Sequence, residues 1–293
     1  MKKKIRFIIN PKSGTAPKHD IPDLINRILD KNQYDFEIAV TEGPKHATAL
    51  SREAAQKNCH VVVSIGGDGS ANEVAEGLLE TETALAFIAA GSGNGMSRHL
   101  KIPMRIENAL HVINTGKIEQ IDTIRLNEAF CLGTIGVGFD AHIAHLFADS
   151  PKRGYLTYVK FVLTEFYKYK PLTYELTVDD RAFSKECFLL TFANSSQFGN
   201  NAVIAPFANV QDGIIEVSML KNFSFLNAPS LIYRLMNNSI HHSNFFSMMK
   251  GKNIVLKNNR LLKAHIDGEA VTFNSDLHIK IMPHSLNVLI PSN

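Results

Sequence analysis

The sequence has few of the residues that build zinc centres or disulfide frameworks. Its three cysteines, Cys59, Cys131 and Cys187, lie far apart and form no CxxC pair. We therefore expect neither a zinc site nor disulfides, as is typical of a reducing compartment. The 12 histidines include no HExxH motif, which argues against a zinc-protease helix.

Long apolar segments and an excess of one charge are also absent. No apolar run approaches the about 20 residues that span a bilayer, and the basic residues 1–6 precede no signal-peptide cleavage site. The 31 basic and 28 acidic residues give a net charge of +3, which is too balanced to predict nucleic-acid binding. We expect a cytoplasmic protein that binds a membrane surface at most, and no nucleic acid.

The length and the apolar pattern predict the architecture. A chain of 293 residues exceeds the usual size of one core, so two domains are expected and one domain is the alternative. Short apolar runs alternate with amphipathic stretches in the first third, which indicates a parallel sheet covered on both faces. Strands are predicted at 6–10, 36–41, 61–65 and 85–90, and helices at 21–29 (with Asp20 as its cap), 47–57 and 70–80.

The pattern changes after about residue 125. Short strand-like segments separated by turn residues predict a mainly antiparallel second domain. The predicted strands are 130–136, 172–178, 186–193, 214–220, 253–256, 263–267 and 277–281, with helices near 152–170 and 226–238.

A glycine-rich segment, SIGGDGSANEV at residues 64–74, follows the third predicted strand. Its glycines allow unusual backbone angles, and Ser70 with Glu73 forms the capping-box pattern that opens a helix. A helix N-terminus attracts an anion, which Asp68 would repel unless a hard cation such as Mg²⁺ lay between them. The alternative is a glycine turn in which Asp68 only caps backbone N–H groups.

Two further loops follow predicted strands of the same sheet. NPKSG occupies residues 10–14, and AAGSGNGMSR occupies residues 89–98 with Ser92 and Asn94 able to bind phosphate or ribose. Because the carboxyl ends of parallel strands share one edge, all three loops are expected to meet where nucleotides bind.

The ordered set of motifs resembles the diacylglycerol kinase catalytic family, which includes bacterial lipid kinases, sphingosine kinases and ceramide kinases. GGDG alone also occurs in NAD kinases and phosphofructokinases, but this set runs nearly end to end. The matching segments are NPKSG (10–14), TEGPKHA (41–47), GGDGSANEV (66–74), GSGN (91–94), GVGFDA (136–141), NSSQFG (194–199), APFA (205–208), QDG (211–213) and IDGE (266–269).

The resemblance implies a fold, α/β plus β. An α/β ATP-binding domain with a parallel sheet would span 1–125 and include a returning strand in 284–293, and a β-sandwich lipid-substrate domain would span 126–283. The implied activity is transfer of the γ-phosphoryl group of Mg-ATP to the hydroxyl of diacylglycerol, a sphingoid base or a related lipid. The alternatives are a kinase of a soluble alcohol or nucleotide, like NAD kinases, and an ATP-binding regulator without turnover.

The resemblance also implies the site residues. A carboxylate that accepts the proton of the alcohol is expected, with Glu269 and Asp267 ranked nearly equal and Asp68 third; the alternative for Asp267 and Gly268 is an ordinary hairpin turn. The implied nucleotide-binding residues are Asn10, Pro11, Lys12, Ser13, Gly14, Thr41, Gly66, Gly67, Asp68, Gly69, Ser70, Ala71, Asn72, Ser92 and Asn94.

The resemblance also implies metal-binding and substrate-binding residues. Asp68 would hold a catalytic Mg²⁺, and a structural Mg²⁺ would take the carboxylate of Asp212 and main-chain oxygens of Asn209 and Ile214, unless this is an ordinary Asp-Gly turn. Asp140 and Arg98 are the implied substrate residues, although Asp140 has the alternative of capping the next helix.

One departure from the family and one basic segment bear on the partners. Gly95 stands where diacylglycerol-specific members carry an aspartate, which favours a sphingoid base or another lipid alcohol. The segment 152–170 is basic and aromatic and either docks on anionic headgroups or packs its aromatic residues inside the second domain. A homodimer is left open.

Overall fold

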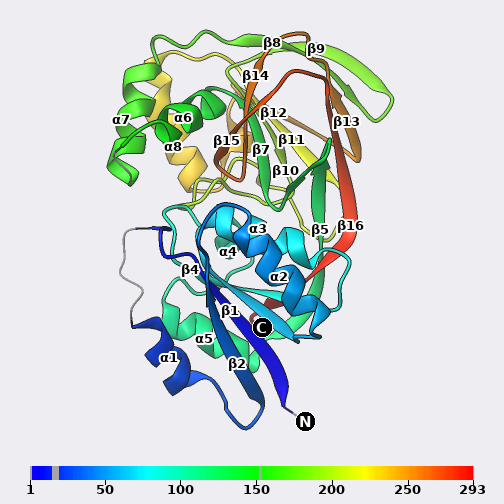
Figure 1. Cartoon of the computed structure of the whole chain (residues 1–293). Helices are drawn as coiled ribbons and strands as arrows, with labels where there is room; N and C mark the ends of the chain where they lie inside the picture. Colours follow the sequence, from blue (N-terminus) through cyan, green and yellow to red (C-terminus); the bar gives the residue numbers. More distant parts are fainter. Residues whose placement is uncertain (1, 15–19, 152–153, 293) are drawn as a thin grey trace. The chain divides into compact units, whose positions relative to one another are not determined.

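The computed structural model describes residues 2–14, 20–151 and 154–292. The chain divides into two compact units (Figure 1). Unit 1 comprises Met1–Asp122 and His284–Asn293, and unit 2 comprises Thr123–Pro283. The strands β5 (Lys117–Leu126) and β16 (Leu277–Ile290) each run from one unit into the other.

Unit 1 is a parallel sheet with helices. Its strands follow the order β2-β1-β3-β4-β16, and the neighbouring pairs are parallel. All six residues of β3 are buried, as expected of a central strand covered on both faces. The elements are β1 (Lys3–Ile9), α1 (Ile21–Ile28), β2 (Tyr34–Val40), α2 (His46–Gln56), β3 (Val61–Gly66), α3 (Asp68–Leu78), β4 (Ala84–Ala89), α4 (Gly95–His99) and α5 (Ile106–Thr115).

Unit 2 contains a six-stranded antiparallel sheet of order β12-β11-β10-β7-β14-β15. Its second sheet follows the order β16-β13-β8-β9. The start of β16 pairs with β13, β13 with β8 and β8 with β9, again antiparallel. The elements are β6 (Ala129–Cys131), β7 (Thr134–Gly138), α6 (Phe139–Ala148), α7 (Tyr155–Glu165), β8 (Leu172–Val178), β9 (Arg181–Cys187), β10 (Leu189–Ala193), β11 (Ile215–Leu220), η1 (Phe225–Asn227), α8 (Ala228–Met236), η2 (Ile240–His242), β12 (Phe246–Gly251), β13 (Asn253–Leu256), β14 (Leu262–Ile266) and β15 (Glu269–Phe273).

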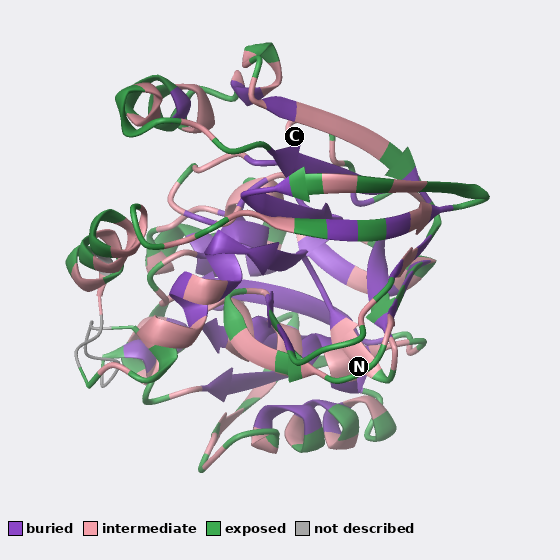
Figure 2. Ribbon diagram, turned by 90° about the horizontal axis from the view of Figure 1, so that it is seen from above, coloured by how far each residue is buried: buried purple, intermediate pink, exposed green. Residues whose placement is uncertain are grey.

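One apolar core joins the two sheets of unit 2. Phe192 of β10 and Val217 of β11 come from the first sheet, Leu176 of β8 and Ile279 of β16 come from the second, and all four are buried in one cluster. Burial concentrates on the strands, whereas exposed residues line the outer faces of the helices (Figure 2). The predicted class, an α/β domain followed by a mainly antiparallel β-sandwich, is confirmed.

The helices differ from the predictions in several places. The predicted helix near 152–170 is shorter, and Lys152 and Arg153 lie outside the described residues. Asp20 precedes α1 but makes no capping hydrogen bond with its side chain. In the described parts of the chain, no helix is both long and apolar enough to cross a membrane.

Close packing of α2 against α3 supplies a test of the fold. A Cβ added at Gly77 of α3 would lie 2.5 Å from the carbonyl oxygen of Thr48 and would also overlap the Ser51 hydroxyl. We expect Gly77→Ala to lower the free energy of unfolding by about 2 kcal/mol, because overpacking costs more than the gain in helix propensity. The control Gly43→Ala meets no atom within 4 Å and should leave urea unfolding unchanged. Equal stability of the two variants would contradict this packing.

Candidate functional site

Four strands of unit 1 end at the same edge of the parallel sheet. Ile9 pairs with Val40 of β2 and with Ile65 of β3, and Gly66 pairs with Ala89 of β4. The segments that follow these strands are the three predicted glycine loops and the one that begins at Thr41. Thr41 is held there by its N–H, which donates to the carbonyl of Ile9 at 2.9 Å. The sequence-predicted nucleotide residues of unit 1 are thus brought together.

Direct contacts tie the first loop to the second. The side-chain amide of Asn10 donates to the Ser70 hydroxyl at 2.9 Å, and the Asn10 side-chain oxygen accepts the N–H of Lys12 at 3.0 Å. The Ser13 hydroxyl donates back to the Asn10 carbonyl at 3.0 Å. Asn10 therefore fixes both the shape of its own loop and the start of α3.

Glycine is required where the loops approach one another. Gly14 has a φ of +63°, and a Cβ there would overlap the carbonyl oxygen of Ala90. A Cβ on Gly67 would lie 3.3 Å from the Cα of Gly91, and one on Gly91 would overlap the Cα of Gly67. Larger residues would force the loops apart, so the glycines permit a cradle of closely spaced backbone groups.

Asp68 lies within the helix rather than in the loop before it. The α3 helix begins at Asp68, with Gly67 as its N-cap and no capping side chain. The first turn of a helix presents unpaired N–H groups and a partial positive charge, so the carboxylate of Asp68 is favoured there even without a metal. This position in the first turn is compatible with metal binding, because a carboxylate offers two oxygens.

The predicted capping box of Ser70 and Glu73 is wrong. The Ser70 hydroxyl accepts the Asn10 amide, and Glu73 serves a different helix. Its carboxylate oxygens accept the N–H groups of Lys45 at 2.9 Å and Ala47 at 3.3 Å, which lie at the start of α2. A tertiary partner has replaced the local one.

The third loop is closed by its own side chains. Asn94 has a φ of +55°, accepts the N–H of Gly91 at 3.1 Å and donates to the Gly91 carbonyl at 2.8 Å. The Arg98 guanidinium donates to the carbonyl of Gly93 at 3.2 Å. Arg98, predicted as a substrate residue, therefore braces the loop, while the side chain of Ser92 is exposed.

The chain supplies few metal ligands of its own. Among the described residues, no three His, Cys, Asp or Glu side chains are close enough to share one metal ion. Asp68 offers one carboxylate at the edge where the loops meet, and a Mg²⁺ ion held by a single carboxylate would need phosphate oxygens and water as its remaining ligands.

In unit 2, the segment IDGE forms the hairpin between β14 and β15. Ile266 pairs with Glu269, and the two turn residues, Asp267 and Gly268, have φ values of +48° and +83°. Positive φ at both positions is the requirement of a type I′ turn. The predicted alternative, an Asp-Gly hairpin turn, thus describes the local structure.

The Asp267 carboxylate accepts three backbone N–H groups, those of Leu132 at 2.9 Å, Gly133 at 2.9 Å and Thr134 at 2.8 Å. Desolvation raises the pKa of Asp267, against the lowering effect of these donors. Glu269 is the first residue of β15 and is exposed. The two acids that the sequence ranked nearly equal therefore have different surroundings, one anchored and one facing solvent.

A buried pair lies directly before this turn. The His265 ring donates from Nε2 to the Asp140 carboxylate at 3.0 Å, and both side chains are buried. The Nδ1 of His265 accepts the N–H of Gly268 at 3.3 Å, which fixes the tautomer. Asp140 also accepts the N–H of Ala141 at 2.8 Å in the first turn of α6. The sequence predicts Asp140 as a site residue but not His265, for which its place two residues before Asp267 is the only signal.

In the segment around Asp212, a lysine side chain lies where a metal ion is predicted. The Asp212 carboxylate accepts the N–H of Ile214 at 3.1 Å and lies 3.7 Å from the ammonium of Lys250. The carbonyl of Asn209 lies 3.5 Å from the N–H of Asp212. A structural Mg²⁺ at these residues remains a prediction, and it would compete with Lys250 for the one carboxylate.

Two family profiles match the chain. The diacylglycerol kinase catalytic domain covers residues 4–126, and the YegS C-terminal NAD kinase beta sandwich-like domain covers residues 133–290. A Chromohalobacter salexigens protein named "Probable lipid kinase YegS-like" is 25% identical over 291 residues, 97% of this chain and 92% of its own length.

Solved structures share the fold. A Bacillus anthracis crystal structure, described as that of a diacylglycerol kinase, has a TM-score of 0.74 at 20% identity and covers 99% of this chain and 97% of its own. A second structure from this organism has a TM-score of 0.79 at 22% identity, with the same coverage.

The histidine at the end of α4 predicts a pH dependence of stability. Burial lowers the pKa of His99 from 6.5 to about 4. Between these values the unfolded chain binds a proton that the folded chain does not, so the free energy of unfolding should fall by up to about 1.4 kcal/mol per pH unit as the pH drops. Urea unfolding of His99→Gln should show a flatter slope from pH 6.5 to 4, and a slope equal to that of the original protein would contradict this role of His99.

The two acids of the hairpin predict different effects on stability. Asp267→Asn loses one accepting oxygen and places an amide against N–H donors, so we expect the free energy of unfolding to drop by about 2 kcal/mol. Glu269→Gln changes an exposed side chain and should shift the free energy of unfolding by less than about 0.5 kcal/mol. Thermal unfolding of both variants checks this; equal effects would show that Asp267 does not anchor the turn.

Proposed function

Since the chain belongs to the diacylglycerol kinase catalytic family, we propose that it is an ATP-dependent lipid kinase, which transfers the γ-phosphoryl group of Mg-ATP to a lipid hydroxyl. The observation that carries the proposal is the meeting of the three glycine loops at one sheet edge. Gly14 approaches Ala90 and Gly67 approaches Gly91 more closely than residues with a Cβ allow.

The loops of unit 1 suit a phosphate chain. Their backbone N–H groups and the N-terminus of α3 provide donors and a partial positive charge for anionic oxygens. Residues 10–14, 66–72 and 91–94 would contact the phosphates, and Thr41 at the neighbouring strand end would contact the nucleotide. The hydrogen bond from Asn10 to Ser70 keeps two of these loops in a fixed relation, so little ordering is needed on binding.

Asp68 gives this edge its specificity for a metal-bound nucleotide. Its carboxylate lies in the first turn of α3, where an unscreened phosphate would meet a like charge. Bound Mg²⁺ would neutralise phosphate charge and draw electrons from the transferred group. Asp68 would hold that ion, so its carboxylate would attract the nucleotide through Mg²⁺ instead of repelling the phosphates directly.

In unit 2, the proton acceptor is the acid whose side chain faces solvent, where a lipid hydroxyl can approach it. Asp267 accepts three N–H groups, and this role as an anchor leaves Glu269 as the residue that accepts the proton of the lipid hydroxyl. His265 then acts as a positioning residue, because it holds the N–H of Gly268 between the two acids. A positioned general base contributes about 10²–10⁴-fold to rate.

A soluble acceptor is the second candidate, because the second half of the chain matches a sandwich described as NAD kinase-like. The lipid assignment draws on the family and on GSGN with Gly95 in the third loop, which resembles sphingosine kinases. Within lipids we propose a sphingoid base or another lipid alcohol ahead of diacylglycerol.

Labelling with γ-³²P-ATP and a total lipid extract separates these functions. We expect label in the organic phase, which chromatography then assigns to one lipid class. A labelled aqueous compound that chromatography distinguishes from ATP and inorganic phosphate would favour a soluble acceptor. Nucleotide binding without any transfer would identify a regulator that lacks turnover.

Variants test the roles within the same assay. Asp68→Ala should abolish transfer, and Glu269→Gln should lower it by about 10²-fold or more, with both proteins folded by circular dichroism. Asp23→Ala removes an exposed acid in the first turn of α1 and should transfer at the original rate. Unchanged turnover in Asp68→Ala would rule out the proposed metal carboxylate.

A further inference from the structure

A polar cavity of about 150 Å³ lies along α8 in unit 2. No residue assigned above to nucleotide, metal or proton transfer contributes to it. Its lining comes from α8 and η2 with the segments beside them: Asn227, Ser230, Leu231, Arg234, His242, Ser243, Asn244 and Phe245. Asn227, Ser230 and Arg234 share one face of the helix, since they are spaced by three and four residues.

The chemistry of the lining is that of an anion site. No acidic residue lines the cavity, and across the described residues Arg234 has no acidic partner within ion-pair distance. The Arg234 fork offers several N–H donors suited to phosphate oxygens. Ser230, His242 and Asn244 add polar groups, and Asn227 stands at the N-cap of α8, where the helix dipole favours negative charge.

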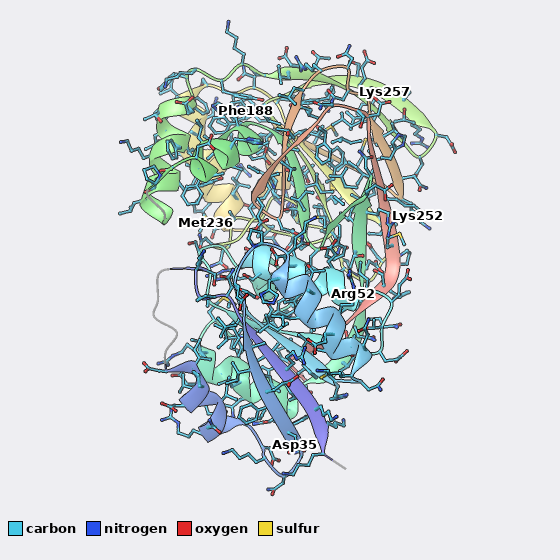
Figure 3. All side chains as sticks on the ribbon, in the orientation of Figure 1. Asp35, Arg52, Phe188, Met236, Lys252 and Lys257 are labelled. Atoms are coloured by element: carbon cyan, nitrogen blue, oxygen red, sulfur yellow. The ribbon has the colours of Figure 1, made fainter. Side chains whose placement is uncertain are left out.

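Exposed apolar residues stand next in the sequence to residues that line this cavity. Leu226 is 89% exposed and precedes Asn227, and Tyr233 is 67% exposed and precedes Arg234. The ring of Phe225 lies 5.2 Å from that of Tyr167, just beyond α7, so the two helical segments share one surface. We call this the α7–α8 surface; Met236, the last residue of α8, is labelled in Figure 3. Its large exposed members are Leu163, Tyr167, Phe225, Leu226, Ile232, Tyr233 and Met236.

The charges on these segments favour an anionic partner. Across residues 154–170 and 221–244 the basic residues are Lys160, Lys168, Lys170, Lys221 and Arg234. The one acid in these ranges, Glu165, already pairs with Lys168 at 2.6 Å and with His142 at 3.1 Å. Exposed Leu, Ile and Tyr between cations are typical of surfaces that enter the headgroup region of a bilayer.

We propose that the cavity binds the phosphate of an anionic phospholipid while the α7–α8 surface enters the membrane interface. The membrane part of this inference rests on the proposed lipid kinase function, because such an enzyme takes its substrate from a bilayer. The phosphate site stands on the cavity and its donors alone. The phosphate could belong to a lipid headgroup or be free inorganic phosphate, and a vesicle-binding experiment distinguishes the two.

The experiment measures co-sedimentation of the full chain with vesicles of phosphatidylcholine, with and without phosphatidylglycerol. We expect binding only when phosphatidylglycerol is present, and an about tenfold loss for Arg234→Gln. Ser230→Asp should cause a similar loss although an acid in the first turn favours the helix, so unfolding would not explain it. Lys160→Gln also removes one positive charge from the α7–α8 surface, but outside the cavity. This variant should lose clearly less vesicle binding than Arg234→Gln.

The other outcomes overturn the proposal. Equal losses in Arg234→Gln and Lys160→Gln would mean diffuse attraction without a phosphate site. Calorimetric binding of inorganic phosphate that depends on Arg234, with no preference for the anionic vesicles, would assign the cavity to free phosphate. Lipid phosphorylation is measured separately in detergent micelles, so a kinase without this site and a membrane-binding protein without kinase activity give different results.

Discussion

The close approach of three backbones at one sheet edge is the constraint on which unit 1 depends. Gly14 meets Ala90, and Gly67 meets Gly91, at separations that exclude any side chain. Parallel pairing of β1, β3 and β4 brings these loops to the same edge, and the bond from Asn10 to Ser70 fixes their relation. The backbone groups of the loops and the N-terminus of α3 therefore lie close together at this edge, and the proposed phosphate chain would bind there at little ordering cost.

In unit 2 the short segment IDGE places two acids in different surroundings. Asp267 occupies a type I′ position and accepts the three N–H groups of residues 132–134, where β7 begins, so one carboxylate holds the hairpin on the sheet. Its neighbour Glu269 begins β15 in an exposed position. His265 joins this turn to α6 through Asp140, which makes the orientation of Glu269 a property of the whole sheet rather than of the turn alone.

The sequence predicts much of this, and the failures share a cause. Continuous Val and Ile runs located β3 and its neighbours within one to three residues, because a buried parallel strand has a strong local signal. The Ser70 and Glu73 capping box failed because Glu73 finds N–H donors on α2, a tertiary partner that no local pattern shows. His265 and Asp140 are 125 residues apart, so their pairing becomes visible only when α6 packs on β14. The sequence does not predict the helices α5 and α6, because the residues at their N-termini give only a weak helix-start signal.

The turn at Asp212 shows how a chain can supply its own cation at a loop where the family resemblance implies a metal. Glu216 on β11 is buried, and desolvation raises its pKa, while its carboxylate accepts the N–H of Phe207 at 2.9 Å. Lys250 pairs across the strands with Glu216, lies 3.7 Å from Asp212 and lies 3.4 Å from the carbonyl of Phe207. One ammonium thus offsets two carboxylates and closes the loop onto the sheet. Because a divalent ion beside Asp212 would meet this positive charge at short range, Mg²⁺ binding there requires Lys250 to swing away, which its exposed and flexible side chain permits only at the expense of these contacts.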